Sequence, residues 1–155
     1  MHSSLSIGAV FALCRQVYSQ DALGDDYIQQ VETSGPFLYL GIKGPIPSFQ
    51  DETHQSNQVW SLAPAGESLV TIQNTNTGDY INCGTSPEGR CELQEEGQVF
   101  QEERKSEDHD IYGFVDQSSS KVLVLTEDGA LSIVEQSDST KPELSDFLLT
   151  QAQCK

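Results

Sequence analysis

Residues 71–84 read TIQNTNTGDYINCG, and this stretch places a polar turn cluster between two short apolar alternations. Ile72 lies before the turn, and Tyr80, Ile81 and Cys83 follow it. Asn, Asp and Gly favour the backbone conformations that reverse a chain, and short apolar alternations are typical of half-buried strands. The stretch therefore predicts a strand, a turn and a second strand.

The same pattern occurs twice more in the chain, which makes it an internal repeat. Residues 113–126 read GFVDQSSSKVLVLT, and the residues aligned with those four apolar positions are Phe114, Val122, Leu123 and Leu125. Residues 27–41 read YIQQVETSGPFLYLG, with one extra residue before the glycine. In this copy Gly35, Phe37, Leu38, Leu40 and Gly41 align with Gly78, Tyr80, Ile81, Cys83 and Gly84.

The three copies also end alike, with an aromatic residue that follows a short polar or acidic segment: QVWSL (58–62), QVFQE (98–102) and SDFLL (145–149). The repeats thus span about 27–67, 68–108 and 111–155, a period of about forty residues. A β-rich unit of this length is too small to bury its own apolar face, so three units are expected to close on one another. The sequence predicts an all-β protein, a β-trefoil with pseudo-threefold symmetry.

The closing aromatic residues have a packing role in this arrangement. We expect Trp60, Phe100 and Phe147 to converge on the common core from three directions. We also expect the apolar residue that begins each second strand to join them, namely Phe37, Tyr80 and Val122.

The first twenty residues differ from the rest, because they hold no acidic residue and contain an apolar run at 5–14. Val17 and Ser19 supply the small-residue pattern that signal peptidase requires. We expect residues 1–19 to be a secretory signal peptide and residues 20–155 to form a single β-trefoil domain that is secreted. The apolar run is too short to span a bilayer, so no membrane insertion is expected.

The four cysteines suit an oxidising compartment. Cys83 and Cys91 flank a segment rich in Gly and Pro, so a disulfide between them is predicted to close a hairpin loop. If the leader is removed, Cys14 leaves with it and Cys154 is unpaired; if the leader stays, these two can pair. The chain has no Cys-x-x-Cys pair and its histidines are scattered, so no metal site or cofactor is expected.

The charge balance and the missing motifs narrow the function. The chain has 24 Asp and Glu against 8 Lys and Arg, a net charge of −16, which would repel nucleic acid and anionic membranes. No nucleophile elbow, zinc-protease motif, phosphate-binding loop or catalytic-cysteine signature occurs. We therefore expect a protein that recognises a partner and is not an enzyme.

The repeats resemble those of the ricin-B-type lectin family, from about Tyr27 to the C-terminus. The middle-copy stretch IQNTNTGDYINC is similar to the family's opening strand pair, and NQVW (57–60) matches its closing Gln-x-Trp with the preceding Asn. The resemblance implies a β-trefoil that binds carbohydrate. It also implies a working site with an Asp on the second strand, an aromatic ring that stacks on the sugar and an Asn beside the closing motif.

No copy keeps that whole set. The positions of the Asp hold Tyr39, Asn82 and Val124, and the middle copy has Gly97 in place of the closing Asn. The resemblance leaves Tyr39, Asn57 and Gln58 as candidate ligand residues in the first copy and Tyr80 and Asn82 in the second. In NQVW we expect Trp60 in the core, Gln58 tying strand to loop and Asn57 free for a ligand. The third copy is expected to be inert.

Two other functions remain open at this point. A β-trefoil protease inhibitor would present Arg90 of the disulfide loop CGTSPEGRC, or Lys43 of GIKGPIPSF, to a protease cleft. A secreted effector or elicitor would bind a host protein through acidic loops such as ELQEEG and SEDHD. The partner is thus a glycan or an extracellular protein, and the oligomeric state is open.

Overall fold

The computed structural model describes residues 25–31, 38–84, 86–137 and 142–152. In these residues twelve strands form one antiparallel sheet, joined by short turns, a 3-10 turn η1 (Ser56–Gln58) and one turn of helix α2 (Pro142–Ser145). The strands are β1 (Asp25–Gln30), β2 (Tyr39–Lys43), β3 (Ile46–Gln50), β4 (Trp60–Gly66), β5 (Leu69–Asn74), β6 (Tyr80–Asn82), β7 (Glu92–Gln94), β8 (Phe100–Arg104), β9 (Ile111–Asp116), β10 (Val122–Leu125), β11 (Leu131–Val134) and β12 (Phe147–Gln151).

Six of the strands close into a barrel. β1 pairs with β4, β4 with β5, β5 with β8, β8 with β9, β9 with β12, and β12 returns to β1. The last pairing runs from Asp26 opposite Gln151 to Gln30 opposite Phe147. Closure leaves no free edge in the barrel wall, which protects the strands from pairing with another chain.

The other six strands form three hairpins, β2–β3, β6–β7 and β10–β11, each paired to the first barrel strand of its own unit. The connectivity of β1–β4 is therefore repeated in β5–β8 and in β9–β12, which we call the first, second and third copies. This is the β-trefoil that the repeats predict, and the predicted fold class is confirmed.

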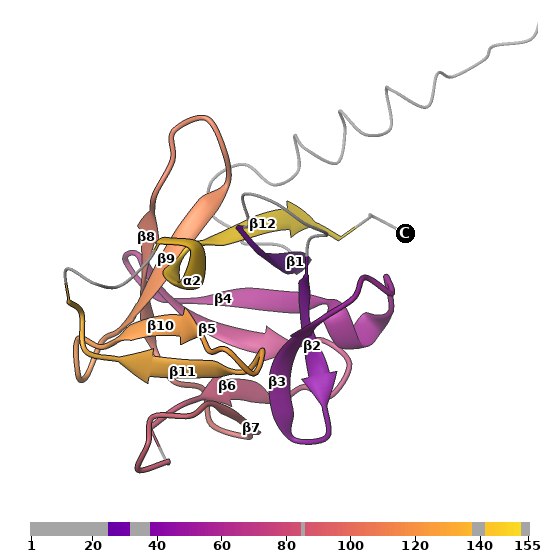
Figure 1. Ribbon diagram of the computed structural model, residues 1–155, viewed down its shortest axis with the longest axis horizontal. Helices are drawn as coiled ribbons and strands as arrows, with labels where there is room; N and C mark the ends of the chain where they lie inside the picture. The colour runs from indigo at the N-terminus through magenta and orange to yellow at the C-terminus, as the bar shows by residue number, and fades with distance from the viewer. Residues whose placement is uncertain (1–24, 32–37, 85, 138–141, 153–155) are drawn as a thin grey trace, which may run out of the picture.

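The hairpins gather at one end of the barrel and hold one another there (Figure 1). Ser48 of β3 bridges Ala130 of the third copy, and the Phe49 N–H donates to the Gly129 carbonyl at 2.7 Å. The Leu93 N–H of β7 donates to the Pro45 carbonyl at 2.9 Å. Backbone bonds between the copies thus fix the loops at this end.

The core forms where the three copies meet. Trp60, Phe100 and Phe147 are at most 1% exposed, and the Trp60 Nε1–H donates to the Leu40 carbonyl at 2.7 Å. Phe147 stacks on Phe49 with ring centroids 5.9 Å apart. The packing role predicted for the closing aromatic residues is therefore correct.

The second set of predicted core residues needs correction. Tyr80 is half-buried and Val122 is buried outside the central cluster, because Ile81 and Leu123 point inward instead. Successive side chains of a strand face opposite sides, so Tyr80 and Val122 belong to the outer face of their strands. Phe37 lies outside the described residues, as do the predicted signal peptide, Cys14 and Cys154.

A disulfide joins Cys83 and Cys91, as their spacing predicts, and both cysteines are buried in the core. Among the described residues, no helix has the length and apolar character that crossing a membrane requires.

Candidate functional site

Gln58 closes the loop that follows β3. Its Nε2 donates to the Asp51 carbonyl at 2.7 Å, and its Oε1 accepts from the Thr53 N–H at 2.8 Å and the Thr53 hydroxyl at 3.0 Å. Gln58 is 0% exposed, so its side chain does not reach a ligand at the surface, contrary to the expectation from the resemblance. Its role is to fold residues 51–58 into one compact loop.

Tyr39 lies at the first copy's Asp-equivalent position and is buried. Burial raises the pKa of its hydroxyl, and so does the hydrogen bond that the hydroxyl makes with the Glu52 side chain. The ring packs edge-on against Tyr27, with centroids 5.8 Å apart. Tyr39 is therefore not an open platform for a sugar, and its hydroxyl faces the Glu52 side chain.

Glu52 also contacts an imidazole on the same loop. The His54 Nε2 lies 2.6 Å from Glu52 Oε1, and the two side chains are 66% and 39% exposed. The His54 ring packs against Tyr27, with centroids 5.7 Å apart. A solvent-accessible carboxylate on this loop thus contacts His54, whose ring packs against Tyr27.

Asn57 lies on the same loop, one residue before Gln58. Its backbone carbonyl accepts from the buried Asn74 Nδ2 at 3.0 Å, which ties this loop to the turn after β5. Its side-chain Oδ1 is shielded from solvent, and no hydrogen-bond partner for it exists in the described part of the chain. A buried acceptor without a donor is destabilising, so this oxygen is an unsatisfied polar atom inside the loop. We call Tyr27, Glu52, His54 and Asn57 the first-copy site.

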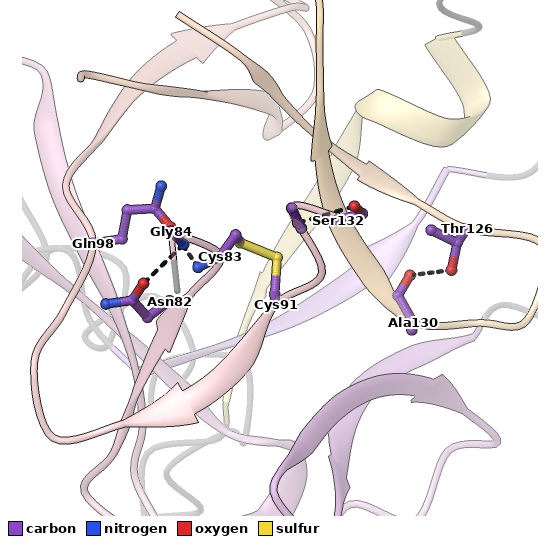
Figure 2. Close-up of a disulfide and its surroundings, with 9 residues drawn as sticks. Asn82, Cys83, Gly84, Cys91, Gln98, Thr126, Ala130 and Ser132 are labelled. Atoms are coloured by element: carbon purple, nitrogen blue, oxygen red, sulfur yellow. Dashed lines mark hydrogen bonds between the residues drawn. A yellow bond between two sulfur atoms is a disulfide. The ribbon is translucent and has the colours of Figure 1, made fainter. Parts of the chain in front are cut away.

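The second copy uses its candidate residues internally (Figure 2). The Asn82 Oδ1 accepts from the Gly84 N–H at 2.9 Å, and its Nδ2 donates to the Glu96 carbonyl at 3.1 Å. Gln98 accepts from the Cys83 N–H at 2.6 Å. Both ends of the Asn82 amide are occupied in shaping the chain around the disulfide, so this residue has a structural role.

Tyr80 explains the missing Asn of the second copy. A Cβ added to Gly97 would lie 2.9 Å from the Tyr80 Cδ1 and 3.1 Å from the Thr71 Cγ2. The ring therefore fills the space over Gly97, and a side chain at 97 would displace it. Tyr80 is packed against its own copy, and the second copy does not present the predicted set of sugar contacts.

Val124 of the third copy is buried. The neighbouring strand residue Ser132 is also buried, and its hydroxyl donates to the Gly89 carbonyl at 2.9 Å.

Arg90 is held in place by the third copy. Its guanidinium lies 2.6 Å from the Asp128 carboxylate, and its backbone bridges Ser132. The flanking Gly89 carbonyl accepts from Ile133 at 2.8 Å, and the Cys91 N–H donates to Leu131 at 2.9 Å. An inhibitory loop needs its backbone free to lie in a protease cleft, and this backbone is already paired.

Lys43 lies at the exposed tip of the β2–β3 hairpin, beside Gly44 with a φ of 64°. Its side chain is therefore accessible.

Among the described residues, no group of three or more His, Cys, Asp or Glu side chains is arranged to hold a metal ion.

The sequence interpretation missed Glu52, His54 and Tyr27. Glu52 and His54 occur in the polar stretch DETHQSN, which has the appearance of ordinary solvated loop. Tyr39 was the residue that could have indicated a partner on this loop. Its long phenol stands where the family has an Asp, and a buried tyrosine hydroxyl needs a polar partner.

The sequence matches no protein-family model and no curated protein. Similar folds occur among solved structures. A ricin B-like lectin from Macrolepiota procera in complex with lactose gives a TM-score of 0.68 at 12% identity, over 84% of this chain and 97% of that one. The designed threefold-symmetric protein ThreeFoil gives 0.65 at 12% identity, over 83% and 99%.

A Polyporus squamosus lectin bound to the epitope Neu5Aca2-6Galb1-4GlcNAc gives a TM-score of 0.64 at 15% identity. The match covers 84% of this chain and 50% of that chain, so the present protein spans half the length of that lectin. Identities this low establish the architecture and carry no information on ligand residues. The chain thus shares its β-trefoil fold with ricin B-like lectins.

Proposed function

We propose that this protein is a secreted, non-enzymatic carbohydrate-recognition protein that binds a glycan at the first-copy site. The observation that carries the proposal is the Glu52 carboxylate, which Tyr39 and His54 hold on an exposed loop beside the Tyr27 ring. This replaces the missing Asp of the second strand with a carboxylate from the following loop.

The chemistry of these side chains suits a pyranose. A carboxylate accepts hydrogen bonds from several hydroxyl groups and donates none. The faces of aromatic rings pack against the apolar C–H face of a sugar. Orientation and specificity then come from a small number of polar groups on a preformed loop.

The net charge of −16 favours a neutral glycan over an acidic one. The fold neighbours include lectins with lactose and with a sialylated trisaccharide. Long-range repulsion between this acidic surface and a carboxylate of sialic acid would weaken the second type of ligand. We therefore expect the protein to prefer neutral galactosides or other uncharged oligosaccharides.

The test is a glycan array followed by calorimetry on any glycan that binds. Wild type is compared with Glu52→Gln, which keeps the shape of the side chain and removes its charge, and with Asn57→Ala. Glu67→Gln is the matched control, because Glu67 is an exposed residue in the β4–β5 turn. We expect each site variant to weaken binding at least about tenfold, the loss of one or two ligand hydrogen bonds, while the control binds as wild type.

Unchanged affinity in both site variants would remove the first-copy site from consideration. Absence of binding to every glycan at high micromolar protein would overturn the carbohydrate function itself.

A further inference from the structure

One positively charged side chain in the described part of the chain has no carboxylate partner. The other Lys and Arg side chains described form ion pairs: Arg90 with Asp128, Arg104 with Asp110, Lys105 with Glu103 and Lys121 with Glu135. Lys43 is exposed and forms no ion pair with a described acidic side chain. In a protein with a net charge of −16, this ammonium keeps its charge and its three N–H donors for another molecule.

The hairpin that carries Lys43 is rigid up to its tip. The pairing of β2 with β3 continues to Lys43 opposite Ile46, so only Gly44 and Pro45 form the turn. Gly44 has a φ of 64°, which glycine adopts without strain, and the proline ring fixes the next φ. The Pro45 carbonyl accepts from the Leu93 N–H of β7 at 2.9 Å. A tip held in this way loses little conformational entropy when it binds.

The surroundings of the Lys43 ammonium are apolar. The hairpin, residues 39–50, contains no acidic residue, and its turn lies at the hairpin end of the barrel (Figure 1). Ile46 is half-buried directly across from Lys43. Residues opposite each other in an antiparallel pair lie on the same face, so Ile46 flanks the aliphatic stem of the lysine. The tip thus presents a single positive charge on an apolar base.

These properties define the kind of partner that fits. A broad acidic surface would be repelled by the net charge of −16, so the partner's carboxylate must be confined to a small area. A narrow pocket with a carboxylate at its floor and apolar walls meets this condition, because the stem packs on the walls while the ammonium pairs below. Endopeptidases that cut after basic residues have such a specificity pocket.

We propose that the tip of the β2–β3 hairpin inserts Lys43 into the specificity pocket of an endopeptidase that cuts after basic residues, and blocks that pocket. Only the side chain and the turn enter the enzyme. The chain reverses at Gly44 directly after Lys43, and the Lys43 backbone is paired with Ile46. Cleavage needs the scissile bond in a near-attack geometry, which this reversal withholds, so the Lys43–Gly44 bond stays intact.

Arg90 cannot take the same role, although it is also an exposed cation. Its guanidinium is paired with the Asp128 carboxylate at 2.6 Å, and its loop lies against β11. The tip is also separate from the first-copy site, because β3 (Ile46–Gln50) runs from the tip to the loop that carries Glu52. Pocket blocking and glycan binding therefore use opposite ends of one hairpin, and each can be tested without the other.

The experiment measures inhibition of trypsin by the purified full chain, with a small chromogenic lysine substrate. Chymotrypsin is the comparison enzyme, because its pocket is apolar. We expect competitive inhibition of trypsin with a constant on the order of 1–100 μM, as suits a small rigid contact, and none of chymotrypsin. Mass spectrometry after incubation should show an intact Lys43–Gly44 bond. Absence of trypsin inhibition at about 500 μM protein would overturn the proposal, and so would cleavage of this bond.

Three variants localise the contact. Lys43→Ala should weaken inhibition at least about tenfold, the loss of one charge-assisted contact. Lys43→Arg keeps the charge and should inhibit within about threefold of wild type, since the pocket accepts both basic side chains. Arg90→Ala is the matched control, an exposed cation removed from the neighbouring hairpin loop, and it should inhibit as wild type does.

Lys43 is exposed at a turn, so neither of its substitutions disturbs the core. Equal inhibition by wild type and Lys43→Ala would overturn the assignment. Loss of inhibition in Arg90→Ala alone would also overturn it, because the contact would then lie on the disulfide loop.

Discussion

One carboxyl side chain at the end of the barrel, Asp26, should make the stability of the protein depend on pH. Asp26 is 8% exposed, and burial, together with the carboxylates of Asp25, Asp110 and Glu102, raises its pKa from 3.8 to about 7. The folded state therefore holds a proton that the unfolded state releases above pH 4. The free energy of unfolding falls as pH rises from about 4 to about 7, and the loss is complete above pH 7.

Asp26→Asn mimics the protonated side chain at every pH. We expect it to match wild type near pH 4 and to be more stable by roughly 4 kcal/mol at pH 8, because the pKa rises by about three units and each corresponds to about 1.4 kcal/mol. Urea unfolding at the two pH values measures the difference. Glu88→Gln removes one carboxylate from an exposed turn and should show no such pH-dependent gain. An equal effect of Asp26→Asn at pH 4 and pH 8 would refute the assigned shift.

At the scale of single residues, the sequence predicted the packing and loop-closing residues better than the residues of the candidate ligand site. Trp60 and Gln58 follow from a local motif, and the structure gives them the packing and loop-closing roles expected. The contact of Tyr39 with Glu52 joins a strand to a loop that passes over it. No spacing rule encodes such a contact, because it depends on how the loop folds back.

Among the elements, the disulfide loop between β6 and β7 is secured twice. The Cys83–Cys91 bond closes it, and backbone hydrogen bonds of Gly89 and Cys91 pair it with β11. A Cβ at Gly89 would lie 2.7 Å from the Ile133 carbonyl, so glycine permits the close approach.

We expect Cys83→Ala with Cys91→Ala to lower the free energy of unfolding by about 2–4 kcal/mol, the usual effect of losing a disulfide. The loop should stay docked, because its backbone bonds to β11 do not need the cross-link. Chemical denaturation measures the first effect, and hydrogen exchange at the Ile133 amide measures the second. A fully exchanging Ile133 amide in a folded variant would show instead that the disulfide alone holds the loop.

The strands of the three repeats follow from the sequence, but two of their side chains do not lie where the repeats predict them. Turn residues and apolar alternation are local signals, and three copies of them specify the trefoil. The repeat alignment predicts Tyr80 and Val122 in the core, although the alternation of Ile81 with Cys83 and of Leu123 with Leu125 indicates the inward face. The inhibitor interpretation of Arg90 met a similar difficulty, because the pairing of its loop with β11 is a contact between copies.

For the whole molecule, charge is the dominant property after the fold. The excess of acidic over basic residues gives −16, and the four ion pairs that Lys and Arg make in the described part of the chain lie at the surface. Exposed pairs contribute little to stability, whereas a large net charge opposes the compact state.

We therefore expect the melting temperature at pH 7.5 to rise by about 2–5 °C between 10 and 150 mM NaCl, because salt screens the repulsion between carboxylates. Differential scanning calorimetry measures it. The same comparison at pH 4, where many carboxylates are neutral, is the control and should show a smaller rise. A melting temperature that falls with salt at pH 7.5 would mean that attractive pairs outweigh the repulsion.

The pairing of β1 with β12 has a consequence for how the protein is made. Asp26 pairs with Gln151, the paired residue that comes latest in the described chain, so the barrel closes only after all twelve strands have been made. Until then β1 exposes strand edges that other nascent chains can join. Yield in a cell should thus depend on chaperones that shield this edge, more than on the stability of the finished barrel.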